Sequence, residues 1–419
     1  MDITNTNFSL TNYKSTYQII KINSGEIVHS LPNEDIETIL DDAIIISKNK
    51  IEKPHTVFDT DVIINDDTHI TFSNLEMNNI SNIIEFCNKF GLLYSSLLAK
   101  EFKDEYCDVF TFLLKQKYNK KLLKYADSDY MSLKTFVAYA TIIKAIYSIN
   151  VELKSLKKIS ENSLPQALIS IGKNLLKLLR IIGEKYSLLL DYTQYTQYIQ
   201  YKPLTSIPEI SSCFYHCYNS NFYYKYNEKR DMLVNTYSPF FRDGMKTTFN
   251  TFYKFLNDKK NSEYSGYVNI MNLYKIKYDD CELILNSKNL YNITLKHNYK
   301  KFLDLDKFRS SVYSIILNIL NEENSKISPW LFYNDKKANV TSKYSLKYLA
   351  QAILLETFFS LSNDDIIKKC AYEKCNKFFS VRNCRHDKKY CSDECKSNKN
   401  CQTYYLKKKL EQPEQNKNK

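Results

Sequence analysis

Four cysteines near the C-terminal end of the chain have the spacing of a metal site. Cys370 and Cys375 form a pair with four residues between them, and Cys391 and Cys395 form a pair with three. Fifteen residues separate the two pairs. A short pair presents two sulfurs to one ion, and four thiolates satisfy Zn²⁺, which takes four tetrahedral ligands in structural sites. The pattern therefore predicts one structural zinc ion bound by these four cysteines.

The distribution of cysteines favours a metal site over disulfides. Six of the 11 cysteines lie in the last 50 residues, and the N-terminal stretch "MDITNTNFSL" lacks the features of a secretory signal. A terminal cluster without such a signal is typical of metal binding. Three further residues of the region are alternatives that could replace one ligand: Cys384, His386 and Cys401. A second small group, without a nearby pair to complete a site, contains Cys213, His216 and Cys217.

The elements that must position the ligands can be read from the residues between and after the pairs. The segment 376–390 has room for a β-hairpin whose apolar side would carry Phe378, Phe379 and Val381. Ser392 is suited to cap a helix whose first turn holds acidic residues and whose last turn holds Lys407–Lys409, as the helix dipole favours. A unit this small cannot bury enough surface to fold alone, so metal binding must stabilise it.

Positive charge is concentrated in the same region. Residues 366–419 contain 15 Lys and Arg against 6 Asp and Glu, a net charge of +9 out of +12 for the whole chain. This asymmetry is typical of a surface that contacts nucleic acid, and lysines and arginines there would contact phosphates. The candidate residues on the hairpin and the helix are Arg382, Arg385, Lys388, Lys389, Lys396, Lys399 and Lys407.

The segments "KKCAYEKCNKFF" and "RHDKKYCSDECKSNKNCQTYYLKKK" resemble the CGNR-type zinc finger of bacterial proteins. The two cysteine pairs match its ligands, Phe378-Phe379 matches its aromatic step, and Lys389 to Ser392 match the step at the third ligand. The sequence departs from the family after Cys395, where Lys-Ser-Asn stands in place of Gly-Asn-Arg. The resemblance implies a treble-clef finger, binding to DNA rather than RNA, and transcriptional regulation with a sensor or partner domain before the finger.

The rest of the chain is predicted to be α+β and mainly helical, with a β-rich start. We expect a β-rich part at 1–75, a mainly helical body at 76–365, the finger with its basic helix at 366–410 and a polar tail at 411–419. Hairpins are predicted around residues 23–25 and 65–67, and a strand pair within 273–298. Apolar residues three and four apart predict helices within 82–102, 132–159, 165–190, 304–323 and 345–362.

No catalytic motif nominates an enzyme. The six glycines are isolated and cannot form a G-x-G-x-x-G turn or a phosphate-binding loop, and the sequence has neither G-x-S-x-G nor H-E-x-x-H. No long uninterrupted apolar run predicts a membrane span, and we expect a cytoplasmic protein. The sequence thus favours a DNA-binding zinc-finger regulator. The alternative is a zinc-stapled structural or protein-interaction module without nucleic-acid binding, and the oligomeric state is not predicted.

Overall fold

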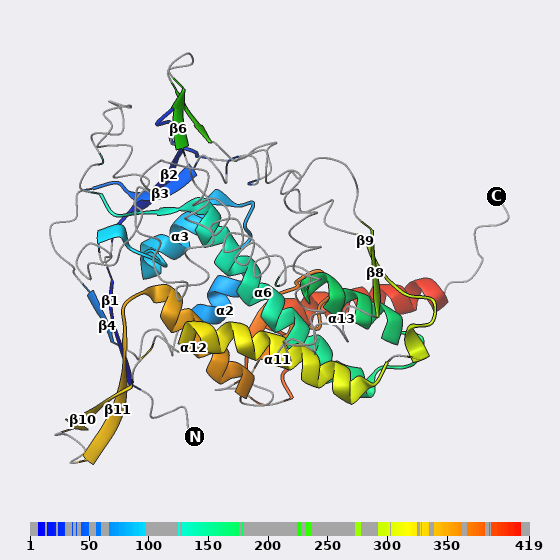
Figure 1. The fold of residues 1–419 in the computed structure, drawn as a ribbon. Helices are drawn as coiled ribbons and strands as arrows, with labels where there is room; N and C mark the ends of the chain where they lie inside the picture. The colour runs from blue at the N-terminus through cyan, green and yellow to red at the C-terminus, as the bar shows by residue number, and fades with distance from the viewer. Residues whose placement is uncertain are drawn as a thin grey trace, which may run out of the picture. The chain divides into compact units, whose positions relative to one another are not determined.

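The computed structural model of the chain divides into two compact units, Met1–Phe358 and Phe359–Lys419 (Figure 1). The structure describes residues 7–12, 15–21, 24–29, 36, 39, 43–49, 56–59, 67–97, 125, 128–175, 178, 224–227, 232–235, 273–277, 292–301, 303–324, 327, 329–334, 339–362, 367–381, 385 and 387–411. The first unit contains both the β-rich start and the helical body. The second unit begins within a helix, a few residues before residue 366, where the finger was expected to start.

A three-stranded antiparallel sheet lies in the first unit. Its strands, in the order β2-β3-β5, are β2 (Tyr17–Lys21), β3 (Ala43–Ser47) and β5 (Tyr130–Ser132). In the register of this sheet Ile45 faces Ile19 on one side and Met131 on the other. All five residues of β3 are buried, as expected of a short continuous apolar run at the centre of a sheet.

The two hairpins predicted in the first 75 residues have different outcomes. The first is confirmed as a chain reversal, because Gly25 adopts a positive φ of 67° and Ile27 bridges antiparallel to Ile20. The second is wrong beyond residue 67, because Thr68–Ser73 is a helix, α2. The Asp67 carbonyl accepts hydrogen bonds from the Ile70 and Thr71 N–H groups and so starts the helix. Residues 60–66 lie outside the described residues.

A second sheet joins the start of the chain to a distant segment. Its order is β10-β11-β1-β4, with β1 (Asn7–Asn12), β4 (Thr56–Asp59), β10 (Pro329–Asn334) and β11 (Asn339–Leu346). β1 pairs with β11 in parallel and with β4 antiparallel. The predicted strand pair within 273–298 is confirmed by β8 (Tyr274–Lys277) and β9 (Asn292–Leu295). A further antiparallel pair consists of β6 (Tyr224–Asn227) and β7 (Met232–Asn235).

Each of the five segments with apolar periodicity contains a helix, although the helix predicted within 82–102 ends at Gly91, and residues 98–102, 176–177 and 179–190 lie outside the described residues. The helices are α3 (Ile80–Phe90), α6 (Leu133–Ser155), α11 (Leu305–Asn324), α12 (Leu349–Ser362) and a helix over residues 164–175. Two short 3₁₀ helices span Leu156–Lys158 and Tyr299–Lys301. The ends of α3 are set locally, because the Asn79 side chain caps its first N–H groups and Gly91, at φ 85°, ends it.

Aromatic side chains form the core where α2, α3 and α6 meet. The ring centroids of Phe72 and Phe86 lie 5.1 Å apart, and those of Phe72 and Phe136 lie 5.3 Å apart. The span Thr135–Ser155 of α6 is long and apolar enough to cross a membrane, and 67% of it is buried inside the protein. Such burial is typical of a core helix, and among the described residues this span alone meets that length and apolarity.

Buried polar contacts add specificity to this core. His69 Nδ1 lies 2.8 Å from Glu356 Oε2, which connects α2 to α12, and the Tyr147 hydroxyl donates to Thr357 Oγ1. The buried Asp129 carboxylate accepts hydrogen bonds from the Ser95 hydroxyl at 2.8 Å and, at 3.2 and 3.3 Å, from Ser96 Oγ and Leu97 N–H. Burial raises the pKa of Asp129 to about 6, although these hydrogen bonds lower it.

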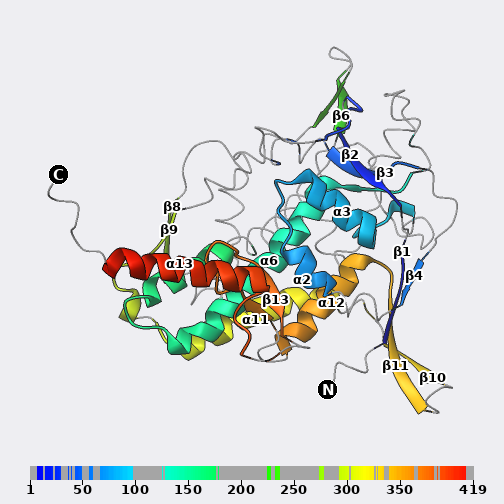
Figure 2. The same ribbon diagram turned by 180° about the vertical axis from the view of Figure 1, so that it is seen from behind.

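The second unit is built from one small hairpin and one helix. Its elements are β12 (Ile367–Lys369), β13 (Phe378–Ser380) and α13 (Asp393–Glu411), and β13 and α13 are labelled in Figure 2. β12 pairs antiparallel with β13, so the hairpin encloses the first cysteine pair. The hairpin expected within 376–390 differs from this pairing, and part of its second half, residues 382–384 and 386, lies outside the described residues.

The described residues are therefore partly helical, with small and mostly antiparallel sheets. This composition agrees with the predicted α+β class at a coarse level. The group Cys213, His216 and Cys217 lies outside the described residues, as do residues 412–419 of the tail.

Candidate metal centre

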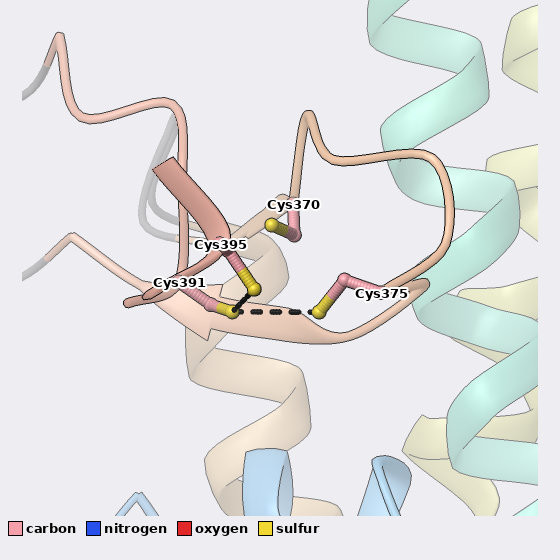
Figure 3. A group of neighbouring side chains, drawn as sticks. All are labelled: Cys370, Cys375, Cys391 and Cys395. Atoms are coloured by element: carbon pink, nitrogen blue, oxygen red, sulfur yellow. Dashed lines mark hydrogen bonds between the residues drawn. The ribbon is translucent and has the colours of Figure 1, made fainter. Parts of the chain in front are cut away.

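The structure brings all four predicted ligands together. The Sγ atoms of Cys370, Cys375, Cys391 and Cys395 lie within 4.8 Å of one another and point toward a common centre (Figure 3). Cys391 Sγ is 3.5 Å from both Cys375 Sγ and Cys395 Sγ. A tetrahedral zinc site with Zn–S bonds of about 2.3 Å has sulfurs about 3.8 Å apart, whereas a disulfide bond measures about 2.05 Å. The spacing therefore fits four thiolates around one ion.

The hairpin positions the first pair. Cys370 directly follows β12, and its N–H donates to the Lys377 carbonyl at 2.8 Å. The Cys375 N–H donates to the Tyr372 carbonyl at 2.9 Å, which closes a tight turn between the two cysteines. Asn376 then adopts a left-handed conformation with φ 52°, a region that asparagine tolerates better than most residues. This turn directs the chain into β13 and leaves both thiols on its inner side.

The start of α13 positions the second pair. Cys391 lies just before the helix and Cys395 in its first turn. The predicted cap is confirmed, because the Ser392 hydroxyl accepts a hydrogen bond from the Cys395 N–H at 3.2 Å. The Ala371 N–H donates to the Lys389 carbonyl at 2.9 Å, so the first pair is tied to the chain just before Cys391.

A very small apolar core lies beside the sulfurs. Its buried members are Cys370, Phe379 and Val381, and Tyr372 and Tyr390 pack against it together with the other three ligand cysteines. Two of the three residues predicted for the apolar side of the hairpin thus belong to this core. Even with the buried Ile367 and Phe378, so few side chains remove too little apolar surface from water to hold a separate fold. A metal ion that cross-linked the sulfurs would add the stability that this unit lacks.

The four thiols differ in acidity because their surroundings differ. Burial, together with hydrogen bonding to the neighbouring thiols, raises the pKa of the Cys391 thiol to about 12. Burial also raises the pKa of Cys375. A hydrogen bond with the Ser392 side chain lowers the pKa of Cys395, and the positive end of the α13 dipole favours thiolates at the same place. A metal ion must displace the protons from the more basic thiols, so its affinity decreases at low pH.

The predicted basic residues have separate surroundings in the structure. Lys389, Lys396 and Lys407 are exposed. The Lys388 ammonium lies 5.7 Å from the centre of the Phe379 ring, and Arg385 forms a two-point ion pair with Asp387. Arg382 lies outside the described residues.

Lys399 has a role inside the unit that the sequence did not indicate. Its ammonium donates to Glu373 Oε1 at 2.8 Å, which links α13 to the turn between the first two cysteines. This hydrogen bond, together with the lysine charge, lowers the pKa of Glu373. Lys399 is therefore engaged with the metal-site turn, and it is a weaker candidate for phosphate contact than Lys396 or Lys407.

Of the three alternative ligands, the structure describes Cys401 alone. Cys401 is exposed on α13, and within the described part of the chain the cluster contains only the four predicted cysteines. Cys384 and His386 lie outside the described residues.

Comparisons with protein-family models, with curated proteins and with solved structures find no match to this chain. Inference of function therefore depends on the geometry of the four cysteines and on the exposed residues around them. Sequence reasoning missed two such features, Glu373 and the adjacent pair Tyr404 and Tyr405, which are exposed on α13. The signal for Glu373 was its place in the turn between two ligands.

Proposed function

We propose that the second unit is a treble-clef zinc finger and that the protein binds nucleic acid through it, DNA rather than RNA, as a regulator of transcription. The observation that carries the proposal is the placement of four clustered thiols at the N-terminus of an exposed, lysine-bearing helix. The hairpin that carries Cys370 and Cys375, followed by a helix that carries Cys395, is the arrangement of a treble clef.

The donor set supports zinc in a structural role. Four sulfurs fill a tetrahedral coordination shell and leave no position open for water or substrate, which is typical of structural zinc sites. When bound, the ion would cross-link the hairpin to the start of α13 through Cys370, Cys375, Cys391 and Cys395. The hydrogen bond between Ala371 and Lys389 and the Ser392 cap hold the two halves in place for this link.

The exposed charge on α13 supports nucleic acid as the partner. Lys396, Lys407 and Lys408 are exposed on this helix, and Lys389 is exposed just before it. Such lysines contact phosphates and position a protein on the nucleic acid without specifying its sequence. The choice of DNA and the sensor or partner role of the first unit come from the resemblance to CGNR-type fingers, in which the larger part precedes the finger.

A binding experiment on the full zinc-loaded chain tests this proposal. We expect fluorescence anisotropy with labelled DNA to show binding that weakens steeply between about 50 and 200 mM salt. The double variant Lys396→Gln/Lys407→Gln removes two predicted phosphate contacts, so its salt slope should decrease by roughly two. Lys307→Gln is the matched control, because Lys307 is an exposed helical lysine of the first unit.

Absence of DNA binding at low salt by the zinc-loaded chain would contradict the proposal. A salt slope that Lys396→Gln/Lys407→Gln leaves unchanged would contradict the role of α13. In either case the zinc-stapled interaction module becomes the better interpretation, and truncation before residue 359 should then lower the melting temperature of the first unit.

A further inference from the structure

Three consecutive residues of α13 expose large apolar side chains. Tyr404 is 63% exposed, Tyr405 is 69% exposed and Leu406 is 55% exposed. Among the described residues, the other exposed large apolar side chains are Ile27 and Leu317, at 41% and 37%. The strongest apolar exposure in the described chain therefore lies on the helix that carries the lysines of the proposed interface.

The tyrosine-rich composition does not account for this exposure. The chain contains 35 tyrosines, and described tyrosines of the first unit such as Tyr17, Tyr139 and Tyr147 are almost completely buried. Tyrosine rings are therefore buried where the first unit has a core. Tyr404 and Tyr405 instead extend from the helix into solvent, where an aromatic ring costs free energy unless a partner covers it.

The geometry of α13 argues against one apolar docking face. Consecutive residues of an α-helix differ in direction by about 100°, so these three side chains point to three sides of the helix. The rings of Tyr404 and Tyr405 are inclined at 72°, with centroids 5.9 Å apart. A membrane surface or a second helix would need the apolar side chains on one stripe. The two tyrosine rings, in edge-to-face contact and largely exposed, can each cover a separate flat partner.

Each ring also has a lysine one turn further along the helix. Lys407 lies three residues after Tyr404, and Lys408 lies three residues after Tyr405 and four after Tyr404. Both lysines are exposed. Residues at these spacings have Cβ atoms about 5–6 Å apart, a separation comparable to that between a base and its own phosphate. The clustered positive charge favours a polyanion and disfavours a second copy of the same helix.

We propose that Tyr404 and Tyr405 stack on unpaired bases, so that the finger binds single-stranded DNA in preference to duplex DNA. The inference rests on the proposed function, because it assigns the form of nucleic acid that the same helix binds. Tyrosine rings stack on any base whose flat face is accessible. In a duplex those faces are covered by neighbouring base pairs, and lysines alone would contact either form.

The test compares single-stranded and duplex DNA of the same length, at one salt concentration, on the full zinc-loaded chain. We expect tighter binding of the single strand. Tyr404→Ala/Tyr405→Ala should weaken single-strand binding by at least about fivefold, because each stacked base contributes about that factor or more. The same variant should leave duplex binding almost unchanged, so the preference disappears.

Two variants separate stacking from general apolar contact. Tyr404→Phe/Tyr405→Phe keeps both rings and should retain the single-strand preference. Leu406→Ala removes a neighbouring exposed apolar side chain without a ring and should have little effect. Each of these positions is exposed, so the variants are expected to fold, and zinc content verifies that the finger is intact.

Several results would overturn the inference while leaving the proposed function in place. They are duplex binding equal to or tighter than single-strand binding, no loss in the double alanine variant, and an equal loss in Leu406→Ala. A dimer of the free protein that the double alanine variant loses would also overturn it, because a second copy would then cover the rings. Absence of binding to both DNA forms is distinct, since it contradicts the proposed function itself.

Discussion

The two units of this chain hold their structures together by different means. In the first unit, aromatic rings such as Phe72, Phe86 and Phe136 pack against one another between helices and are removed from water. In the second unit Cys370, Phe379 and Val381 form a small buried cluster, and four sulfurs converge beside it. Burial stabilises the first unit, and the proposed metal ion would supply most of the stability of the second.

This difference implies that each unit responds to its own perturbation. Removal of metal should affect the finger and spare the first unit, and loss of core packing should do the reverse. Perturbations of single polar groups should have smaller effects that remain within one unit. A treatment that disturbs the unit it should leave intact would contradict this difference between the units.

Metal removal is expected to have the largest effect. A strong chelator should unfold the finger, because structural zinc contributes about 10–16 kcal/mol in small zinc-binding units. Hydrogen exchange measures this directly: the N–H groups of Cys370 and Ala371, bonded to the Lys377 and Lys389 carbonyls, should lose protection. The N–H groups of α6 should keep theirs. Equal loss in α6, or continued protection in the finger, would contradict the division into two kinds of stability.

Truncation of a core aromatic side chain should have the second largest effect. Phe72→Ala removes a fully buried ring that contacts Phe86 and Phe136, so we expect a loss of about 3–5 kcal/mol in the free energy of unfolding of the first unit. Denaturant unfolding measures this loss. Phe72→Leu keeps most of the volume and should cost less than about 1.5 kcal/mol. Loss of metal from the folded Phe72→Ala protein would show that the finger depends on this core.

The Asp129 carboxyl should make the stability of the first unit depend on pH. Its pKa is raised to about 6 in the folded chain, above the unfolded value of about 3.9. The folded state therefore binds more protons between these values, and stability falls as pH rises from about 4 to about 6, by up to about 3 kcal/mol. Asp129→Asn keeps an oxygen to accept from Ser95 and Ser96 but cannot ionise.

Denaturant unfolding at several pH values distinguishes Asp129→Asn from the wild type. The variant should lack this decline, so its stability relative to the wild type should increase with pH across that window. Parallel pH profiles of wild type and Asp129→Asn would show that Asp129 does not carry the effect.

The ion pair between Glu373 and Lys399 should have the smallest effect. Both side chains lie at the surface of the finger, where water and salt screen the attraction, so Glu373→Gln should weaken zinc binding by less than about fivefold. Because the pKa of Glu373 is lowered in the folded chain, the ion pair stabilises the finger at pH values above the ordinary carboxyl pKa, and this stabilisation is lost as pH falls. Competition for zinc with a chelating dye measures the change. A loss as large as that from removing a ligand would mean that Glu373 acts on the metal directly.

The cluster of four cysteines could be predicted from the sequence because the signals for it are local. Each cysteine pair lies within five residues, and the Ser392 cap and the acidic first turn of α13 lie beside the second pair. Spacing alone indicated the four neighbouring thiols, although it left Cys384, His386 and Cys401 as alternatives. The β12–β13 pairing could not be predicted, because the three residues before Cys370 carry no distinct strand signal, and the expected hairpin was placed after the first cysteine pair, within 376–390.

Features that depend on distant residues could not be predicted in the same way. Thr68–Ser73 contains β-branched residues and suggested a strand, but the packing of Phe72 between Phe86 and Phe136 favours a helix. The parallel pairing of β1 with β11 joins segments from opposite ends of the first unit. Asp129 accepts hydrogen bonds from groups more than 30 residues away. Glu373 accepts a hydrogen bond from Lys399, which was predicted to contact phosphate.

Zinc content is the most direct test of the central claim, that one ion bound by four cysteines holds the second unit together. Elemental analysis of the freshly purified full chain should give one zinc per chain. Cys391→Ser should contain none, and Cys401→Ser, which changes an exposed cysteine outside the cluster, should retain one. Wild-type protein without zinc, or equal zinc content in Cys391→Ser, would contradict the account.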